Sequence, residues 1–372
     1  MIRIDEIYET VFWKFLNSLP KPSRMFYFSP FGRTDPDSLN CFHNGLNNEH
    51  NYVVLFDQEP LDFNRHDISF SEVQRRCQNL YPAWPLRLPS TLDTNPILIT
   101  SEKANFDTVK ICCKYGYLHL HYFFHGWAAL DWFRGYNRSF LIAPPESRNI
   151  TKTFIMPNRI IGGERSHRII MMYHIIKNNL LDNHISFPRI CPVEHQSIND
   201  LTSSLAHQIP DIQTQFGTVN LPLNFDNETD HPMHSYQLSL FDQCQESLLY
   251  LVSETVANGS RIYLTEKTFK PICLQMPFIL IAGAGSLEYL RSYGFKTFNE
   301  FWDEDYDHEE DDLTRFKKIA EILAGLNNLG IRQKQQMYTH MRFVLEHNYN
   351  HFYHGGFESV LWNELRGLLN VL

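Results

Sequence analysis

A short hydrophobic strand followed closely by a helix start is the feature that most constrains how this chain can fold. Residues 248–252 are all hydrophobic, and the carboxylate of Glu254 comes shortly after them. A loop then leads to Thr265, a residue type that commonly caps the first turn of a helix. Strand, loop and helix in this order build α/β folds, whose ligands bind at the carboxyl ends of the strands. We therefore expect an α/β fold with a ligand site beside Glu254 and Thr265.

Lys267 lies in the first turn of this expected helix. A cation there opposes the helix dipole, so its position needs another reason, and a bound anion is the simplest one. Free backbone N–H groups at a helix start, aided by a cation, form a phosphate site. Lys267 and the nearby Lys270 are therefore candidate phosphate ligands.

A second cationic helix start is expected earlier in the chain. Residues 153–156 predict a strand, and the pattern of apolar residues predicts an amphipathic helix from about 167 to 181. The glycine-containing loop between them carries Arg159, Arg165 and Arg168. Guanidinium and backbone N–H groups around a helix start suit a diphosphate, and a solvated basic turn is the alternative.

The stretch from Tyr263 to Lys267, taken with Glu254 and with the strand from Pro277 to Leu280, resembles the donor-sugar signature of a known family. This family is the fucosyltransferase-like glycosyltransferases of the α-1,3-fucosyltransferase type. There, a Glu-containing strand precedes a V-T-E-K-like helix start and a P-V-V-L-like strand. The chain also resembles a set of proteins carried by tailed phages. The resemblance covers roughly the C-terminal third of the sequence.

The resemblance implies two Rossmann-like α/β domains that face each other across a cleft, the arrangement called GT-B. A length of 372 residues suits two domains. Residues 1–147 would bind the acceptor and residues 148–372 the nucleotide sugar, with closing helices at the C-terminal end. The stretch 142–151, which contains two adjacent prolines, is the expected linker.

The resemblance also implies roles for individual residues in the donor site. Basic side chains would neutralise the diphosphate, Glu254 and Glu266 would contact ribose or sugar hydroxyls, and Tyr263 would pack on the base or the sugar. The expected donor-binding residues are Arg159, Arg165, Arg168, Glu254, Tyr263, Thr265, Glu266, Lys267 and Lys270. Together they predict a transferase that uses a nucleotide sugar as co-substrate.

A general base is expected after the apolar strand at residues 52–56, which runs into Asp57 and Glu59. The family places an E-S-P-like motif after a strand of the acceptor domain, with its Glu as the base of an inverting reaction. Glu59 and Pro60 match that motif without its Ser, so Glu59 is the expected base and Asp57 its rival. His125 is a further candidate for an acid/base or acceptor-stacking role. A polar turn without catalytic function is the alternative.

No metal or other cofactor is expected. Asp305 and Asp307 have D-x-D spacing, but the acidic run continues to Asp312, and such a run usually marks a solvated helix start. His119 and His121 would share one face of a strand with no evident carboxylate or Cys partner, so packing is expected there. The basic residues of the donor site can neutralise the leaving group without a divalent ion.

Composition limits the setting and the partners. The sequence has no apolar run of membrane-spanning length and no visible signal peptide, and its odd number of Cys, seven, argues against a complete disulfide framework. We expect a cytoplasmic protein, in the host cytoplasm if it is encoded by a phage. A net charge of −9 argues against a broad nucleic-acid surface but permits a local basic groove.

The acceptor is left open between a glycan and a hydroxylated base of phage DNA. A base within a duplex would have to leave the stack before it could reach a cleft. A non-catalytic protein that senses or holds a nucleotide or nucleotide sugar is the alternative function. Such a protein would need the cations but not Glu59.

Overall fold

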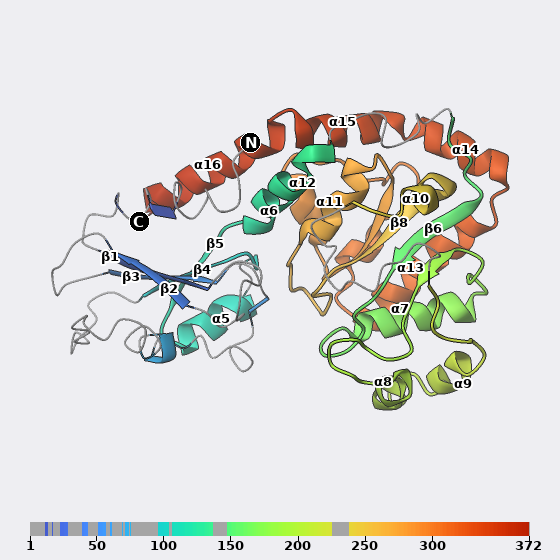
Figure 1. Cartoon of the computed structure of the whole chain (residues 1–372), viewed down its shortest axis with the longest axis horizontal. Coiled ribbons are helices and arrows are strands. Elements are labelled where there is room, and N and C mark those ends of the chain that lie inside the picture. Colours follow the sequence, from blue (N-terminus) through green and yellow to red (C-terminus); the bar gives the residue numbers. More distant parts are fainter. Residues whose placement is uncertain are drawn as a thin grey trace. The chain divides into compact units, whose positions relative to one another are not determined.

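The computed structural model describes residues 12–13, 17, 23–28, 39–43, 51–56, 60–61, 69, 71–73, 75, 96–103, 106–136, 147–224 and 238–371. The chain divides into two compact units. The first comprises Met1–Asp131 and Glu358–Leu372, and the second comprises Trp132–Phe357. Each unit contains a sheet with parallel strands and helices around it, which confirms the expected α/β class (Figure 1). The expected domain boundary at residue 147 stays a prediction.

The first unit contains a sheet with the strand order β2-β1-β3-β4-β5. Its central strands bury hydrophobic runs, such as Val53–Leu55, because helices and loops cover both faces of a parallel sheet. Among the described strands of this sheet, β1 and β2 pair in antiparallel orientation and the other pairs are parallel. The strands are β1 (Ser23–Phe28), β2 (Leu39–His43), β3 (Asn51–Phe56), β4 (Ile97–Thr100) and β5 (Leu118–His121).

Two helices of the first unit flank β5. Helix α5 (Phe106–Lys114) precedes the strand, and α6 (Phe124–Phe133) follows it and ends in a short 3-10 turn. His125, the candidate for an acid/base or acceptor-stacking role, therefore lies in the first turn of a helix. Helix α6 is apolar on nearly all sides, which is typical of a helix buried in a core.

The last helix of the chain, α16 (Gly356–Val371), packs within the first unit. Its Trp362 meets Trp127 edge to face with the ring centroids 5.0 Å apart. Its Glu364 accepts a hydrogen bond from the backbone N–H of Phe123 at 3.3 Å. Most of this helix thus belongs to the N-terminal unit, although it lies at the opposite end of the chain.

The second unit contains a fully parallel sheet with the strand order β7-β6-β8-β9. Every residue of its central strand β8 is buried. The strands are β6 (Lys152–Pro157), β7 (His184–Ser186), β8 (Ser247–Ser253) and β9 (Phe278–Ile281). These bounds agree with the hydrophobic runs that predicted strands at 153–156 and 248–252.

The connections of this sheet reverse direction between β6 and β8. Strand β6 leads through α7 (Ser166–Lys177) to β7 on one side, and β8 leads through α11 (Glu266–Cys273) to β9 on the other. The carboxyl ends of β6 and β8 therefore form a topological switch point, where open α/β sheets bind their ligands. Of the predicted donor-binding residues, Glu254 directly follows β8 and Thr265 caps α11 at this edge.

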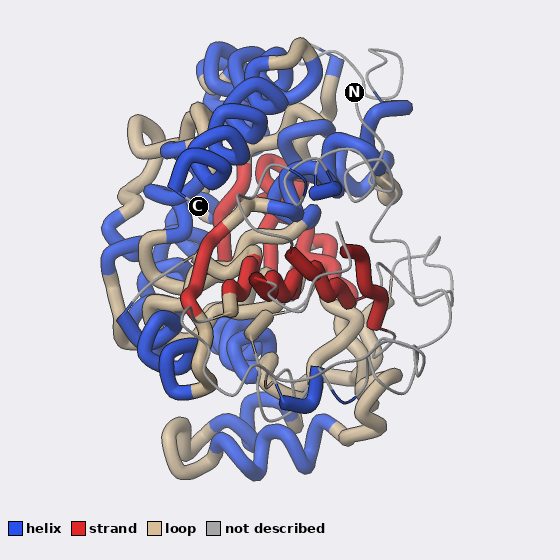
Figure 2. Tube along the Cα trace, turned by 90° about the vertical axis from the view of Figure 1, so that its left-hand side faces the viewer, coloured by secondary structure: helices blue, strands red, loops and turns tan. Residues whose placement is uncertain are grey.

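Helices form most of the remaining regular structure of the described chain, and Figure 2 shows them in blue. Helix α13 packs against α7 and β6, while α11 packs against β8 and α15. Among the helices that the structure describes, none is long and apolar enough to cross a membrane. The further helices are α8 (Ile198–Leu205), α9 (Ile212–Phe216), α10 (Phe241–Glu246), α12 (Ser286–Ser292), the 3-10 turn η5 (Asp305–His308), α13 (Asp312–Asn327), α14 (Ile331–His340) and α15 (Arg342–Tyr353).

Candidate functional site

Glu254 ties the end of β8 to the start of α11. Its buried carboxylate accepts hydrogen bonds from the Thr265 N–H at 3.1 Å, the Thr265 hydroxyl at 2.6 Å and the Thr268 hydroxyl at 2.6 Å. A negative charge at a helix start stabilises the helix dipole, and hydrogen bonds to a charged group are stronger than neutral ones. Glu254 therefore holds the helix start from inside the protein. The described hydrogen bonds of its carboxylate all go to Thr265 and Thr268, and its contact with a sugar or ribose hydroxyl stays a prediction.

Lys267 lies close to this helix start and has internal partners. The expected capping role of Thr265 is confirmed, because its hydroxyl accepts a hydrogen bond from the Lys267 N–H at 3.3 Å. The Lys267 ammonium donates to the hydroxyls of Thr265 at 3.0 Å and Thr255 at 3.2 Å, and it lies 3.4 Å from the Glu266 carboxylate. These contacts explain a cation in the first turn without an anion. The side chain is still 31% exposed, so it can also meet a ligand.

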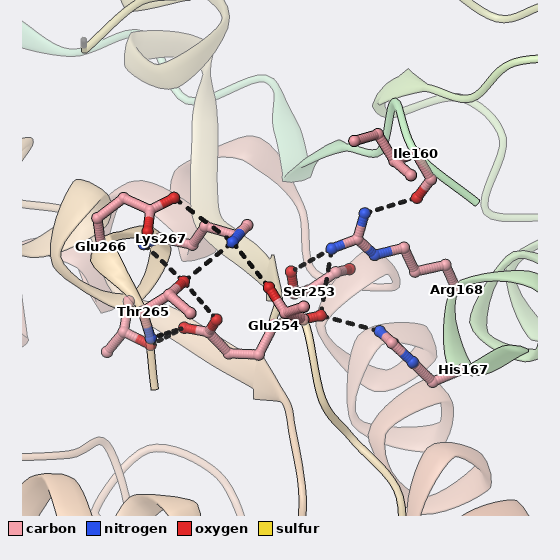
Figure 3. Close-up of polar contacts among 10 residues, drawn as sticks. Ile160, His167, Arg168, Ser253, Glu254, Thr265, Glu266 and Lys267 are labelled. Carbon is pink, nitrogen blue, oxygen red and sulfur yellow. Dashed lines mark hydrogen bonds and ion pairs between the residues drawn. The ribbon is translucent and has the colours of Figure 1, made fainter. Parts of the chain in front are cut away.

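Arg168 joins the end of β8 to the loop that follows β6 (Figure 3). Its guanidinium donates to the carbonyl oxygens of Ile160 at 2.6 Å, Ser253 at 3.1 Å and Glu254 at 3.2 Å. Burial, with a contribution from the nearby Arg165, lowers the pKa of Arg168 to about 10, so the group is still charged at neutral pH. These bonds give Arg168 a structural role at the switch point, while its contact with a phosphate stays a prediction.

His167 adds a second contact between α7 and the end of β8. Burial, reinforced by the charge of Arg168, holds the pKa of the His167 ring well below its ordinary value, so the ring is neutral. Its Nε2 lies 3.0 Å from the Glu254 carbonyl oxygen, and the neutral ring donates from that nitrogen. Figure 3 shows the result: the carboxylate of Glu254 points toward Thr265, and its carbonyl points toward His167 and Arg168.

The glycine loop before α7 has an acidic partner. Arg165 donates to the Glu194 carboxylate at 3.1 Å and to the Gly162 carbonyl oxygen at 3.2 Å. The N–H of Gly163 donates to the side chain of Gln196 at 3.1 Å. Some of the groups that we expected to bind a diphosphate, such as the Arg165 guanidinium and the Gly163 N–H, are therefore already paired within this unit. Arg159, in the same loop, is partly exposed.

The remaining predicted donor residues lie on or just before α11. Tyr263 and Glu266 are buried, and Lys270 is partly buried. Burial lowers the pKa of Lys270 to about 8, against the opposing attraction of Glu266. An ammonium group with this pKa changes charge close to neutral pH, which is unusual for lysine. Lys270 is therefore partly neutral just above neutral pH.

The structure brings only some of the predicted residues together. Glu254, Thr265, Glu266 and Lys267 meet at the start of α11, and Arg168 reaches the same strand end from α7. The expected bases Asp57 and Glu59 lie outside the described residues. His125 is buried in α6 of the first unit, with its ring 6.1 Å from that of Phe124.

Four residues at this edge were not among the expected site residues: Asn158, His167, Ser253 and Thr268. The spacing of Thr265 and Thr268, one helical turn apart, could have identified Thr268 as a second donor to a carboxylate. No sequence signal pairs His167 with the carbonyl of Glu254, because the two residues lie far apart in the chain. Asn158 and Ser253 could have been found from their positions at the carboxyl ends of β6 and β8.

The acidic run after residue 302 contributes to two helix starts, of which that of α13 is the expected solvated one. The carboxylate of Asp307 is buried and accepts hydrogen bonds from the N–H groups of Leu287 at 2.9 Å and Glu288 at 3.1 Å, in the first turn of α12. Asp311 caps α13 by accepting from the Thr314 N–H at 2.8 Å. Within the described ranges no group of three His, Cys, Asp or Glu side chains could hold a metal ion.

The carboxyl edge of the first sheet also gathers polar groups. Glu102, just beyond β4, is buried and accepts a hydrogen bond from the Leu61 N–H at 3.0 Å. The Nδ1 of His121 lies 3.2 Å from the Glu102 carbonyl oxygen, and Nε2 of His119 lies 2.7 Å from the Thr100 hydroxyl. Burial lowers the pKa of both imidazoles to about 4, so they are neutral and serve as hydrogen-bonding groups.

Comparisons with protein-family models, with curated proteins and with solved structures find no match to this chain.

Proposed function

We propose that the protein is a glycosyltransferase that moves a sugar from a nucleotide-sugar donor to an acceptor hydroxyl. The observation that supports this most is the switch point between β6 and β8, which is bordered by the start of α11 and by the partly exposed Lys267. Open α/β sheets bind nucleotides and related ligands at such a point, with phosphates at a helix start. The donor would lie along this edge.

Transfer of the sugar leaves a diphosphate that has to be stabilised as its negative charge develops. Lys267, whose side chain is partly exposed, can donate to a phosphate. Lys270, with a pKa near 8, would gain its full charge when an anion binds beside it. No divalent metal is needed for this step, and Asp307 is already committed to capping α12.

The acceptor hydroxyl would lose its proton to Glu59, with Asp57 as the rival base, in an inverting reaction. The acceptor would be a glycan or a hydroxylated base of phage DNA, bound by the N-terminal unit in a GT-B arrangement. Loss of a general base typically lowers turnover a hundredfold to ten-thousandfold, roughly, without removing substrate binding. Turnover and donor affinity therefore report on the two halves of the proposal separately.

Donor binding is the first test. A panel of UDP-, GDP-, CMP- and dTDP-sugars is screened by thermal shift, since a ligand of the folded state raises its stability, and the best ligand is titrated by calorimetry. Lys267→Ala should weaken its binding roughly ten- to a hundredfold, as expected for one hydrogen bond to a charged group. Lys317→Ala on the exposed side of α13 is the matched control and should change nothing. Equal affinities of wild type and Lys267→Ala would remove Lys267 from the donor site.

A non-catalytic nucleotide-binding protein is the second candidate, because the start of α11 and the partly exposed Lys267 could bind a nucleotide without a general base. A binding protein would bind the same donor, but no transfer to a glycan or to hydroxylated DNA, and no slow hydrolysis of the donor, would follow. Product analysis by NMR separates the two candidates and gives the anomeric configuration of any product.

A further inference from the structure

Asn158 stands out in the second unit because its side chain is buried and has no hydrogen-bond partner. It is 1% exposed, and among the residues that the structure describes neither its amide oxygen nor its amide nitrogen has a partner. Ser253 is 7% exposed, and its hydroxyl is also buried without a hydrogen-bond partner, as is Nε of Arg168. Buried polar atoms are nearly always paired, so three unpaired groups in one region require an explanation.

These three groups belong to the switch point. The backbone of β6 pairs with that of β8, and continuing the register of Ile155 with Tyr250 brings Asn158 opposite Ser253. On the other side, the N–H of Asn158 donates to the Ser186 carbonyl oxygen at the end of β7. Arg168 reaches across from α7 to the carbonyl of Ser253 at 3.1 Å. The unpaired atoms therefore gather where the sheet is expected to meet its ligand.

The kinds of unpaired atom limit the ligand. A carboxamide offers two N–H donors and one acceptor, a hydroxyl both donates and accepts, and the Nε of arginine only donates. A phosphate oxygen accepts but does not donate, so it would leave the amide oxygen of Asn158 without a partner. A ligand hydroxyl can donate to that oxygen and accept from the amide nitrogen or from Ser253. Because both side chains are so deeply buried, a small group fits better than the face of a ring.

We propose that Asn158 and Ser253 bind one or two hydroxyl groups of the ligand held at the β6–β8 edge. This inference rests on the proposed function, and the hydroxyls would be those of the ribose or of the transferred sugar. Asn158 and Ser253 are buried, so the atoms that cover them have to move when the ligand reaches them. The phosphates lie on the Lys267 side, at the start of α11, and contact neither Asn158 nor Ser253.

The test compares three ligands that differ in their hydroxyl groups. They are the best nucleotide sugar of the panel, its nucleoside diphosphate, and the 2′,3′-dideoxy form of that diphosphate, which keeps both phosphates. Calorimetric affinities are measured for wild type, Asn158→Ala and Ser253→Ala. Ser247→Ala is the control, because Ser247 lies buried at the opposite end of the same strand and donates to the Gln243 carbonyl oxygen at 2.8 Å.

Asn158→Ala should weaken binding of the nucleotide sugar roughly ten- to a hundredfold. Ser253→Ala should weaken it roughly three- to tenfold, because fewer hydrogen bonds are removed. An equal loss for the nucleoside diphosphate assigns the contact to the ribose, and no loss for it assigns the contact to the transferred sugar. The dideoxy diphosphate should bind all variants equally. Ser247→Ala should leave every affinity unchanged.

Stability without ligand supplies an independent readout. Ser253→Ala should not lower the melting temperature of the free protein, since its hydroxyl has no partner, whereas Ser247→Ala should lower it because a bond is lost. The inference is overturned if the nucleotide sugar binds Asn158→Ala and Ser253→Ala as tightly as wild type, as would happen if water alone satisfied these groups. It is also overturned if these two substitutions weaken binding of the dideoxy diphosphate as much as they weaken binding of the nucleotide sugar. Binding of no ligand by the wild type would overturn the proposed function along with this inference.

Discussion

The hydrogen bond from Thr268 to Glu254 should be one of the strongest single contacts of the second unit. Thr268 is fully buried, and its hydroxyl donates at 2.6 Å to a buried carboxylate. Thr268→Val replaces the hydroxyl by a methyl group of similar size, so the change removes the bond without opening a cavity. A hydrogen bond to a charged group contributes about 1.5–3 kcal/mol, and we expect the free energy of unfolding to fall by that amount.

Thr202→Val is the matched control for this prediction. Thr202 is also buried in a helix, but its hydroxyl donates to a neutral acceptor, the Ile198 carbonyl oxygen, at 2.8 Å. A neutral bond contributes about 0.5–1.5 kcal/mol, so this variant should lose less stability. Both free energies come from urea unfolding followed by circular dichroism, with the slopes compared to ensure that the same transition is measured. If Thr268→Val costs no more than Thr202→Val, the charge of Glu254 does not strengthen the helix start as argued.

Three further predictions concern catalysis, pH and metals. Glu59→Gln should lower turnover roughly a hundredfold to ten-thousandfold with donor affinity unchanged, and a larger loss in Asp57→Asn would move the base to Asp57. Burial places the pKa of Lys270 at about 8 in the folded protein against an ordinary 10.5, so the unfolded chain binds more protons between these values. The urea midpoint of wild type relative to Lys270→Met should therefore rise from pH 8 to pH 10, and a flat or falling difference would contradict the burial of this amine. Asp307→Ala should destabilise the protein by about 1 kcal/mol, because it removes the cap of α12, while substitution of the exposed Asp305 by Ala should not. Exhaustive chelation of divalent metals should leave turnover unchanged.

Local patterns in the sequence predicted the elements that carry the candidate site. The hydrophobic run at 248–252 predicted β8, and the capping residue Thr265 predicted the start of α11, because each signal lies within a few neighbouring residues. The acidic run was interpreted as a solvated helix start, which the exposed Asp311 at the start of α13 confirms, whereas Asp307 is buried and caps α12. Strand β2 was not predicted, since residues 39–43 mix polar and apolar side chains and their pairing with β1 depends on the rest of the fold.

The partners of the site residues could not be predicted in the same way. The sequence offered Glu254 to a sugar and Arg168 to a phosphate, but the structure gives each of them buried contacts within the chain. Asp307 caps a helix that begins about twenty residues before it. Such partners are chosen by the tertiary structure, which brings distant segments together after the local elements are defined. Sequence patterns therefore located the edge of the candidate site, but the contacts of its residues within the chain could be found only from the structure.

The bond from Arg168 to Ser253 also bears on when this edge can form during synthesis. It joins residues that are 85 positions apart, and the bonds to Thr265 and Thr268 extend the required chain further. Closing so long a loop has an entropic cost that only the completed contacts offset. A nascent chain cannot complete this edge until Thr268 has emerged from the ribosome. Ligand binding to ribosome-bound chains of increasing length would thus report when this edge is complete, although α12 to α15 of the second unit follow later in the chain.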